Sequence, residues 1–292
     1  MDLLIGGLIG GLAQGILYGL LGFATILLYK STGVANFAVG TLATVSVFVA
    51  YKLVGQGLSL AASAGVALLG SLVIGAVVYL AVMLPNNGAG HLNLTVRTFG
   101  VYLFAAAILN ATWAKGQPFQ FPSVFSSNAA FSLGGTTVSW NIVGAVFVAA
   151  LLVLGFVLLF RYTGTGLLLQ AVAARPDIAR LLGTRTRRLT LYAWAMSTVV
   201  GACVGLMVAP VSLLSSDMLD PYLLYGFSAA VIGGLTHLYG VFLVGALIGV
   251  LNNLAAVYAN ADVGALVVFA ILLTVLVVRP WGLFGRAPVE RL

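Results

Sequence analysis

Residues 138–160 read Val138-Ser-Trp-Asn-Ile-Val-Gly-Ala-Val-Phe-Val-Ala-Ala-Leu-Leu-Val-Leu-Gly-Phe-Val-Leu-Leu-Phe160 and contain no charged side chain. A helix that crosses a bilayer needs about 20 mostly apolar residues, so this stretch predicts a transmembrane helix. The whole chain resembles it, with 62% hydrophobic and only 7% charged residues among 292. Such a composition excludes an ordinary soluble domain, which has about 25% charged residues, and it excludes a disordered chain.

Charge-free runs divide the rest of the chain into further segments of the same kind. Their continuous apolarity favours helices, because the strands of a membrane barrel alternate apolar and polar residues. We therefore predict an all-α polytopic membrane protein, a single transmembrane domain over 1–292 with about eight or nine transmembrane helices. The segment at 222–235 has only 14 residues, so we expect a broken or re-entrant helix there. The nine predicted segments are 3–29, 33–54, 59–84, 96–114, 138–160, 189–213, 222–235, 239–259 and 263–279.

The basic residues predict an orientation for these segments. Cytoplasmic loops carry an excess of Lys and Arg, and the loop at 161–188 alone holds six arginines. With nine crossings and that loop in the cytoplasm, only Lys52 and Lys115 among the 13 basic residues fall outside. The amino terminus is then outside and the carboxyl terminus inside a cell (inner) membrane. If 222–235 does not cross, one end changes side. The net charge of +7 is thus explained by topology and indicates no nucleic-acid partner.

Several kinds of chemistry are missing from the sequence. Lys30, Lys52 and Lys115 follow Tyr, Tyr and Ala, so no Walker A motif can bind ATP in this chain. The two histidines stand alone, and the chain has a single cysteine, so we expect no metal site and no cofactor. Asp217, Asp220 and Asp262 are predicted near the outer ends of the segments, which disfavours a carrier powered by its own buried acid. We predict that the chain is not itself an enzyme.

Small residues predict how the first segment packs. Gly7, Gly11, Gly15 and Gly19 recur every four residues and share one helix face. Small side chains at this spacing let a second helix approach closely in lipid. We therefore expect this face to form a tight helix–helix contact.

The loop at 161–188 contains a short helix. Pro176 suits the first helical turn, Asp177 complements the helix dipole, and Gly183 suits the position after the helix. The helix is amphipathic, so it either lies on lipid headgroups or docks into a groove of a cytoplasmic partner. Its predicted apolar face consists of Ile178, Leu181 and Leu182.

Three stretches resemble one known family, the membrane permeases of ABC importers for branched-chain amino acids and related solutes. Near the amino end, Asn36-Phe37-Ala38 follows a Gly-rich first helix, as in the family. The loop sequence 173–183 is similar to the family's ATPase-coupling segment. Ala229-Ala230-Val-Ile-Gly233-Gly234, continuing to Gly245, resembles its Gly-Gly block.

This resemblance implies a fold, a function and partners. The fold would be that of a type II ABC importer permease, and the solute a branched-chain amino acid or a related small neutral or zwitterionic molecule. The partners would be a second permease subunit, identical or homologous, two cytoplasmic ATPase subunits that hold ATP and Mg, an extracytoplasmic solute-binding protein, and membrane lipid. The expected coupling residues are Ala174, Arg175, Asp177, Ile178, Ala179, Arg180, Leu182 and Gly183.

Uncharged polar residues inside the segments are candidates for the solute path. Each is costly in lipid unless it faces protein or water, although an interhelical hydrogen bond explains any single one equally well. A neutral lining suits a zwitterionic or uncharged solute. Two alternatives remain, a passive channel for small neutral solutes and a membrane scaffold subunit. The candidate path residues are Asn36, Thr41, Asn110, Ser228, Asn252 and Asn253.

Overall fold

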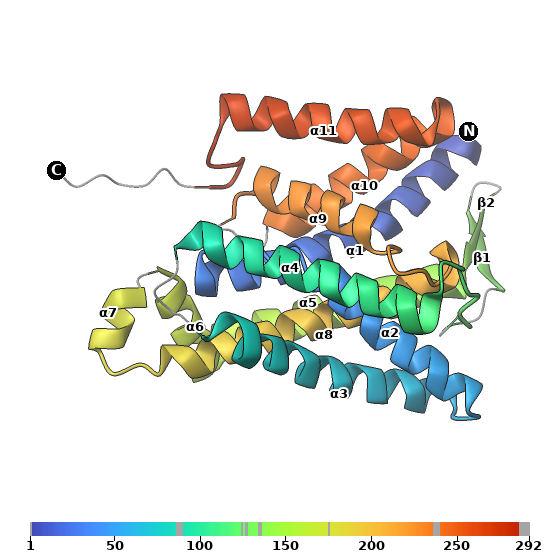
Figure 1. Ribbon diagram of the computed structural model, residues 1–292. Helices are drawn as coiled ribbons and strands as arrows, with labels where there is room; N and C mark the ends of the chain where they lie inside the picture. The colour runs from blue at the N-terminus through green and yellow to red at the C-terminus, as the bar shows by residue number, and fades with distance from the viewer. Residues whose placement is uncertain are drawn as a thin grey trace.

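The computed structural model is a bundle of roughly parallel and antiparallel helices, and it describes residues 2–85, 90–123, 125, 128–133, 136–174, 176–235 and 240–285. Long helices run between two ends of the bundle (Figure 1). Short helices α6 and α7 lie at one end and a β-hairpin at the other. The helices are α1 (Asp2–Thr32), α2 (Val39–Gly55), α3 (Leu60–Val78), α4 (His91–Leu109), α5 (Trp140–Tyr162), α6 (Gly164–Ala174), α7 (Pro176–Leu181), α8 (Thr186–Ser212), α9 (Asp220–Gly233), α10 (Gly240–Tyr258) and α11 (Ala261–Val278).

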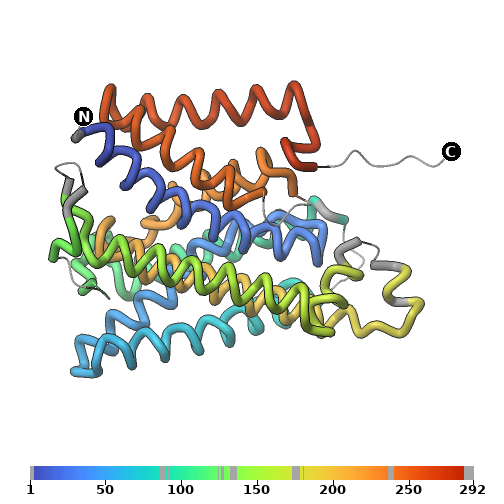
Figure 2. Tube along the Cα trace, turned by 180° about the vertical axis from the view of Figure 1, so that it is seen from behind, coloured from blue at the N-terminus to red at the C-terminus, as the bar shows by residue number. Residues whose placement is uncertain are grey.

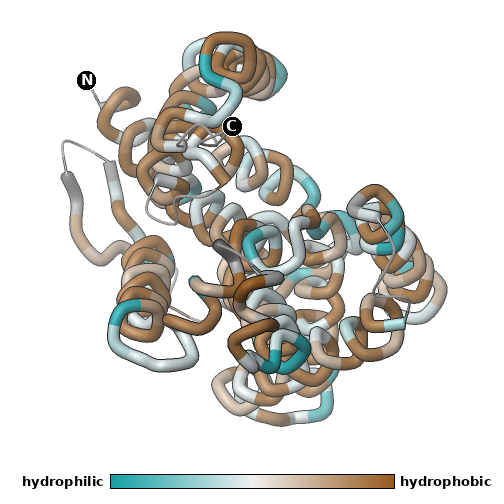
Figure 3. Tube along the Cα trace, turned by 90° about the vertical axis from the view of Figure 1, so that its left-hand side faces the viewer, coloured by the Kyte–Doolittle hydropathy of each residue, from teal (hydrophilic) through white to brown (hydrophobic). Residues whose placement is uncertain are grey.

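Seven of the helices in the described part of the chain are long and apolar enough to cross a membrane. They are α1, α3, α4, α5, α8, α10 and α11, where α3 and α4 each continue as a π-helical turn, η1 (Tyr79–Met83) and η2 (Asn110–Ala114). The chain is therefore a multi-pass membrane protein. Viewed along the bundle (Figure 3), hydrophobic residues also colour the outward faces of the helices, as expected for contact with lipid.

The other two predicted segments contain the short helices α2 and α9, of which only α2 is shorter than its predicted segment. Segment 33–54 contains α2, because Gly33 (φ +69°) ends α1 and residues 34–36 are not helical. Segment 222–235 contains α9, which begins with Pro221 in its first turn and has 14 residues. The expectation of about eight or nine transmembrane helices, possibly one of them broken or re-entrant, is thus corrected to seven helices long enough to span in the described part of the chain, together with two short helices. Before each of these two short helices, a non-helical stretch spans part of the distance between the two ends of the bundle.

A two-stranded antiparallel sheet, β1 (Ala129–Leu133) and β2 (Thr136–Ser139), adds to the expected all-α fold. It forms in the polar segment before α5, where Ser139 caps the helix by accepting a hydrogen bond from the Ile142 N–H. The amino terminus of α1 lies at this hairpin end and α11 ends at the α7 end (Figure 1). The described chain thus starts and finishes at opposite ends of the bundle.

The bundle centres on α1, which packs along α10 (Figure 2). Of its most apolar window, 78% is buried, against 11% for α5 and for α11. The predicted glycine face makes this contact: a Cβ on Gly15 would stand 2.6 Å from the Gly245 carbonyl oxygen. The two backbones touch because neither side carries a side chain there, which confirms the expected close approach.

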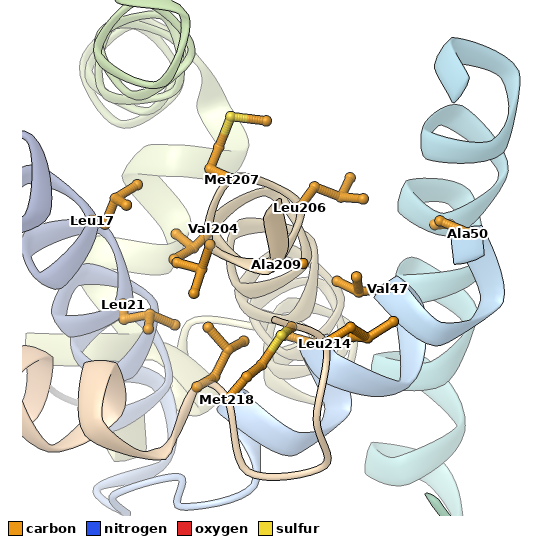
Figure 4. Close-up of a cluster of buried hydrophobic side chains, with 14 of the residues drawn as sticks. Leu17, Leu21, Val47, Ala50, Val204, Leu206, Met207, Ala209, Leu214 and Met218 are labelled. Carbon is orange, nitrogen blue, oxygen red and sulfur yellow. The ribbon is translucent and has the colours of Figure 1, made fainter. Parts of the chain in front are cut away.

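A buried apolar cluster ties the non-helical stretch at 213–219 to the bundle. Leu214 and Met218 from this stretch pack with residues of α1, α2 and α8 (Figure 4). Leu214 is fully buried and Met218 is 5% exposed. The stretch is therefore anchored inside the fold although it forms no helix.

Candidate functional site

One face of α4 carries a row of polar and small side chains. Residues four positions apart share a helix face, and Thr98, Tyr102, Ala106 and Asn110 follow this spacing. The rest of α4 is largely unburied, since only 17% of its most apolar window lies inside the bundle. The row therefore lies on a helix that covers the outside of the fold.

A groove with a cavity volume of about 480 Å³ follows this row from the hairpin end. Its opposite wall is the stretch before α9, which holds Ser215, Ser216 and Asp217. The Asn110 Oδ1 accepts a hydrogen bond of 3.1 Å from the Ser216 hydroxyl and joins the two walls. The groove is polar and is lined by Tyr102, Ala106, Asn110, Ala114, Gly116, Gln117, Pro118, Ser215, Ser216 and Asp217.

Tyr102 and Asp220 meet at the inner end of the groove. The Tyr102 hydroxyl donates a hydrogen bond of 2.8 Å to Oδ2 of Asp220. Tyr102 lies near the middle of the span Leu92–Ala114, so Asp220 lies halfway between the ends of the bundle. The expectation that Asp220 lies near an outer end is therefore wrong.

The sequence held a signal for this position. A helix of 14 residues rises only about 21 Å, against about 30 Å for the hydrocarbon layer. Because α9 ends beside Trp281, after α11, its first residue has to lie inside the bundle. Asp220 is that residue, and its place along the sequence alone does not reveal this depth.

The start of α2 lies one turn further along the same face of α4. The Thr98 hydroxyl accepts from the Phe37 N–H (3.4 Å), and its proton lies between the Thr95 carbonyl of its own helix (2.8 Å) and the Ala35 carbonyl (3.3 Å). Oδ1 of Asn36 accepts from the Ala38 N–H at 2.9 Å and starts the helix. The beginnings of α2 and α9 are also close, since a Cβ on Gly40 would stand 3.5 Å from Cβ of Leu219. The two short helices α2 and α9, each preceded by a non-helical stretch, thus begin close together beside α4.

The predicted path residues separate into two groups. Asn36 and Thr41 are buried at the start of α2, and Asn110 lies in the groove. The Ser228 hydroxyl donates to the Leu224 carbonyl of its own helix. Asn253 donates to the Gly7 carbonyl at 2.9 Å, which joins α10 to α1, and Asn252 lies against Gly264 of α11. The last three residues are not brought together with the groove.

The loop at 161–188, predicted to contain one short helix, contains two, α6 and α7, and the expected coupling residues run from the end of α6 through α7 to the turn after it. Pro176 is the first residue of α7, and Gly183, the second residue after the helix, has φ +81°. The Thr184 N–H closes the helix end on the Ala179 carbonyl at 3.0 Å, the bond expected when a helix ends in a left-handed glycine. The local sequence prediction of this helix and its termination is confirmed.

The two sides of α7 differ in burial. Ala179 is buried, whereas Ile178 and Leu182 are 46% and 80% exposed. Arg175 lies outside the described residues, as do the side chains of Ala174, Asp177 and Arg180. Ile178, and Leu182 just after the helix, thus lie on its exposed side, opposite Ala179.

Basic residues gather at the α6–α7 end. Lys30 is in the last turn of α1, Arg161 in the last turn of α5, and Arg279 follows α11. Arg97 anchors the same end by donating to the Pro85 carbonyl at 2.6 Å. This distribution agrees with the asymmetry read from the sequence.

Comparison with known proteins identifies the family. The family model described as "Branched-chain amino acid transport system / permease component" matches residues 7–276. The chain is 24% identical to the high-affinity branched-chain amino acid transport system permease protein LivH of Escherichia coli (strain K12), over 94% of this chain and 93% of LivH. It is 26% identical to the probable branched-chain amino acid transport permease protein LivH of Methanocaldococcus jannaschii, over 91% and 88% of the two chains.

Two further similarities bear on solute and fold. The fructose import permease protein FruF of Bifidobacterium longum is 26% identical over 75% of this chain and 60% of FruF. A chain of the solved structure "PsaBC from Streptococcus pneumoniae in complex with Fab" superposes with a TM-score of 0.52 at 14% identity, over 94% of this chain and 91% of that one, which indicates a shared fold. The chain belongs to the family of branched-chain amino acid transport permease components, membrane subunits of ABC transporters whose ATPase activity lies on separate subunits.

Proposed function

We propose that this chain is one permease subunit of a type II ABC importer and forms the path for a branched-chain amino acid or a related small neutral or zwitterionic solute. A second permease subunit, two cytoplasmic ATPase subunits and an extracytoplasmic solute-binding protein complete the importer. The observation that carries the proposal is the polar groove along α4, which reaches from the hairpin end to Tyr102 and Asp220 in the middle of the bundle.

Physical chemistry argues that this groove faces water or protein. Asp217 is exposed on its wall, Asn110 is exposed at its mouth, and Ser216 beside it is half-buried. A charged or amide side chain that contacts lipid inside the membrane raises the free energy by several kcal/mol, roughly 2.5–3.5 kcal/mol for an aspartate at the bilayer centre. A permease–permease interface with a water-filled path along α4 removes this cost.

The proposed path gives a role to the two short helices α2 and α9 and to the non-helical stretches before them. Tyr102 and Asp220 close the inner end of the groove, and the starts of α2 and α9 pack against each other beside them. Tilting of α4 away from α9 would open this closure without breaking a regular helix. We propose that the basic α6–α7 end lies in the cytoplasm, by the excess of Lys and Arg there, and the hairpin end outside.

Thiol labelling of a groove residue tests the path. In a Cys203→Ala background, Ala106→Cys should react with a membrane-impermeant thiol reagent added from outside, and labelling should block leucine uptake. The control is Leu103→Cys, which is 52% exposed on the lipid side of α4 and should not react, because a thiol in lipid does not ionise. Equal labelling of both positions, or labelling of Ala106→Cys from inside only, would contradict the proposed path.

The coupling role of α7 has its own test. We propose that Ile178 and Leu182 fill a groove of the ATPase subunit, since both are exposed at the basic end. Ile178→Ser with Leu182→Ser should lower transport-linked ATPase activity at least about tenfold, whereas Ile178→Val with Leu182→Met should retain it because the face stays apolar. Co-purification of two ATPase subunits with the wild type is expected. Their absence would favour a passive channel or a scaffold.

A further inference from the structure

The first turn of α2 gathers hydrogen-bond donors without acceptors. Asn36 is 2% exposed and Thr41 is 1% exposed. Neither Nδ2 of Asn36 nor Oγ1 of Thr41 has a partner within the part of the chain that the structure describes. Oδ1 of Asn36 holds the Ala38 N–H at 2.9 Å, which keeps the side-chain amide over the helix start. Buried polar groups are rarely left unpaired, so these two groups indicate a ligand.

The backbone adds donors to the same place. The first N–H groups of a helix have no acceptor within the helix, and here no side chain caps α2. The Thr41 side chain leans toward the helix start, because Cα–Cβ bonds tilt toward the amino end of a helix. Helix dipole, free N–H groups, amide and hydroxyl together form a site for negative charge.

The negative charge of Asp220, close to this turn, indicates further which kind of ligand would fit. Gly40 of this turn faces Leu219, the residue before Asp220, and the Cβ–Cβ distance would be 3.5 Å. Thr98, which holds the chain next to Asn36, is one α4 turn from Tyr102. Buried unpaired donors and a carboxylate thus lie on neighbouring elements, an arrangement that fits a solute with an anionic and a cationic end.

We propose that the first turn of α2, with Nδ2 of Asn36 and Oγ1 of Thr41, binds the carboxylate group of the transported solute. Asp220 faces the ammonium end of the same molecule. This site rests on the proposed function, since the solute reaches it from the groove once the Tyr102–Asp220 contact opens. Asn36 and Thr41 are thereby specificity residues for carboxylate-bearing solutes.

Two isosteric variants test the site in the complete transporter, reconstituted in proteoliposomes with its ATPases and binding protein. Thr41→Val removes only the hydroxyl, and Asn36→Asp keeps the acceptor for Ala38 while replacing the donor with negative charge. The matched control is Thr44→Val in the same helix. The Thr44 hydroxyl is buried and donates to the Gly40 carbonyl of its own helix at 3.1 Å.

The probes are labelled leucine, which has a carboxylate, and labelled fructose, which has none. We expect leucine uptake by the wild type, a fall of at least about tenfold in both variants, as for one lost hydrogen bond to a charged group, and a change below about twofold in Thr44→Val. Thermal unfolding of each purified protein reports folding, and Thr41→Val alone decides if Asn36→Asp does not fold.

The outcomes separate the two proposals. Leucine uptake by Thr41→Val equal to that of Thr44→Val overturns the carboxylate site and leaves the permease function intact. Uptake of fructose but not leucine by the wild type also overturns the site alone. Uptake of neither probe overturns the proposed solute class, and the carboxylate site with it.

Discussion

The α1–α10 contact and the region where α2 and α9 begin beside α4 lie in the same bundle but differ in how they treat polar groups. Along α1 and α10, glycines let the backbones touch, and Asn253 donates to the Gly7 carbonyl. Beside α4, Asn36 and Thr41 have unpaired donors and a groove of about 480 Å³ opens to the surface. The first region is closely packed, although Oδ1 of Asn252 in α10 is also buried and unpaired among the described residues, whereas the second region holds a groove and the unpaired groups of Asn36 and Thr41.

The comparison teaches that residue type does not separate structural from functional polar residues in a membrane bundle. Asn253 and Asn36 are both uncharged amides inside apolar segments. Asn253 joins two helices, as interhelical hydrogen bonds in membranes commonly do. Asn36 starts a broken crossing and keeps its Nδ2 free among the described residues. The backbone around each residue decides its role.

The largest effect, on the stability of the protein, is expected from a substitution that forces α1 and α10 apart. Gly15→Leu places a side chain where a Cβ would already stand 2.6 Å from the Gly245 carbonyl oxygen. Overpacking costs about 1–3 kcal/mol or more even where side chains can shift, and here backbone would have to move. We expect little monodisperse protein after purification, measured by size-exclusion chromatography. Gly155→Leu, with open space around the glycine, should purify like the wild type, and equal yields would contradict the tight contact.

The next effect concerns charge beside α4. Asp220→Asn keeps the shape of the residue but removes the charge that accepts the Tyr102 hydrogen bond of 2.8 Å. Asp220 is also the group proposed to face the ammonium end of the solute. A bond to a charged group contributes about 1.5–3 kcal/mol, so loss of that contact should lower leucine uptake at least about tenfold while the protein still folds. The control is Asp262→Asn, which changes an exposed acid in the first turn of α11. A similar loss in both variants would remove any special role of Asp220.

A smaller effect is expected from the structural amide. Asn253→Ala removes the bond to Gly7 and should lower the free energy of unfolding by about 0.6–1.7 kcal/mol, the range for interhelical hydrogen bonds in membranes. Thermal unfolding in detergent measures the change, with Thr274→Val as control, because its hydroxyl bonds only to its own helix. Leucine uptake per folded molecule should stay within about twofold. A loss of uptake without a loss of stability would contradict the structural role of Asn253 and would assign this residue to the solute path.

The smallest effect, a slight gain in stability, is expected from a substitution in α3, outside both compared regions. Gly65 of α3 is exposed and has open space around it, so Gly65→Ala should fit without contact. Alanine favours the helix by about 0.8–1 kcal/mol over glycine, and we expect a slight rise in unfolding temperature. A fall instead would show that this glycine, too, contacts another surface in the assembled transporter.

Local sequence signals predicted much of this protein. The charge-free runs predicted the apolar segments, and Pro176 with Gly183 predicted where α7 begins and ends. The glycine spacing predicted the close face of α1. The hairpin was missed, since short strands in a polar segment give no strong periodic signal. The depth of Asp220 was missed because it depends on a 14-residue helix reaching one end of the bundle.

The sequence by itself determined that the chain crosses membranes as helices, because apolarity and helix periodicity are local properties that lipid imposes on every segment alike. It also set the basic asymmetry between the two ends. Only the tertiary structure decided which polar residues meet, placing Asn36 beside Thr98 and Asp220 beside Tyr102, while Asn253 pairs with Gly7. Those contacts join residues 61 to 246 positions apart, so no local pattern can encode them.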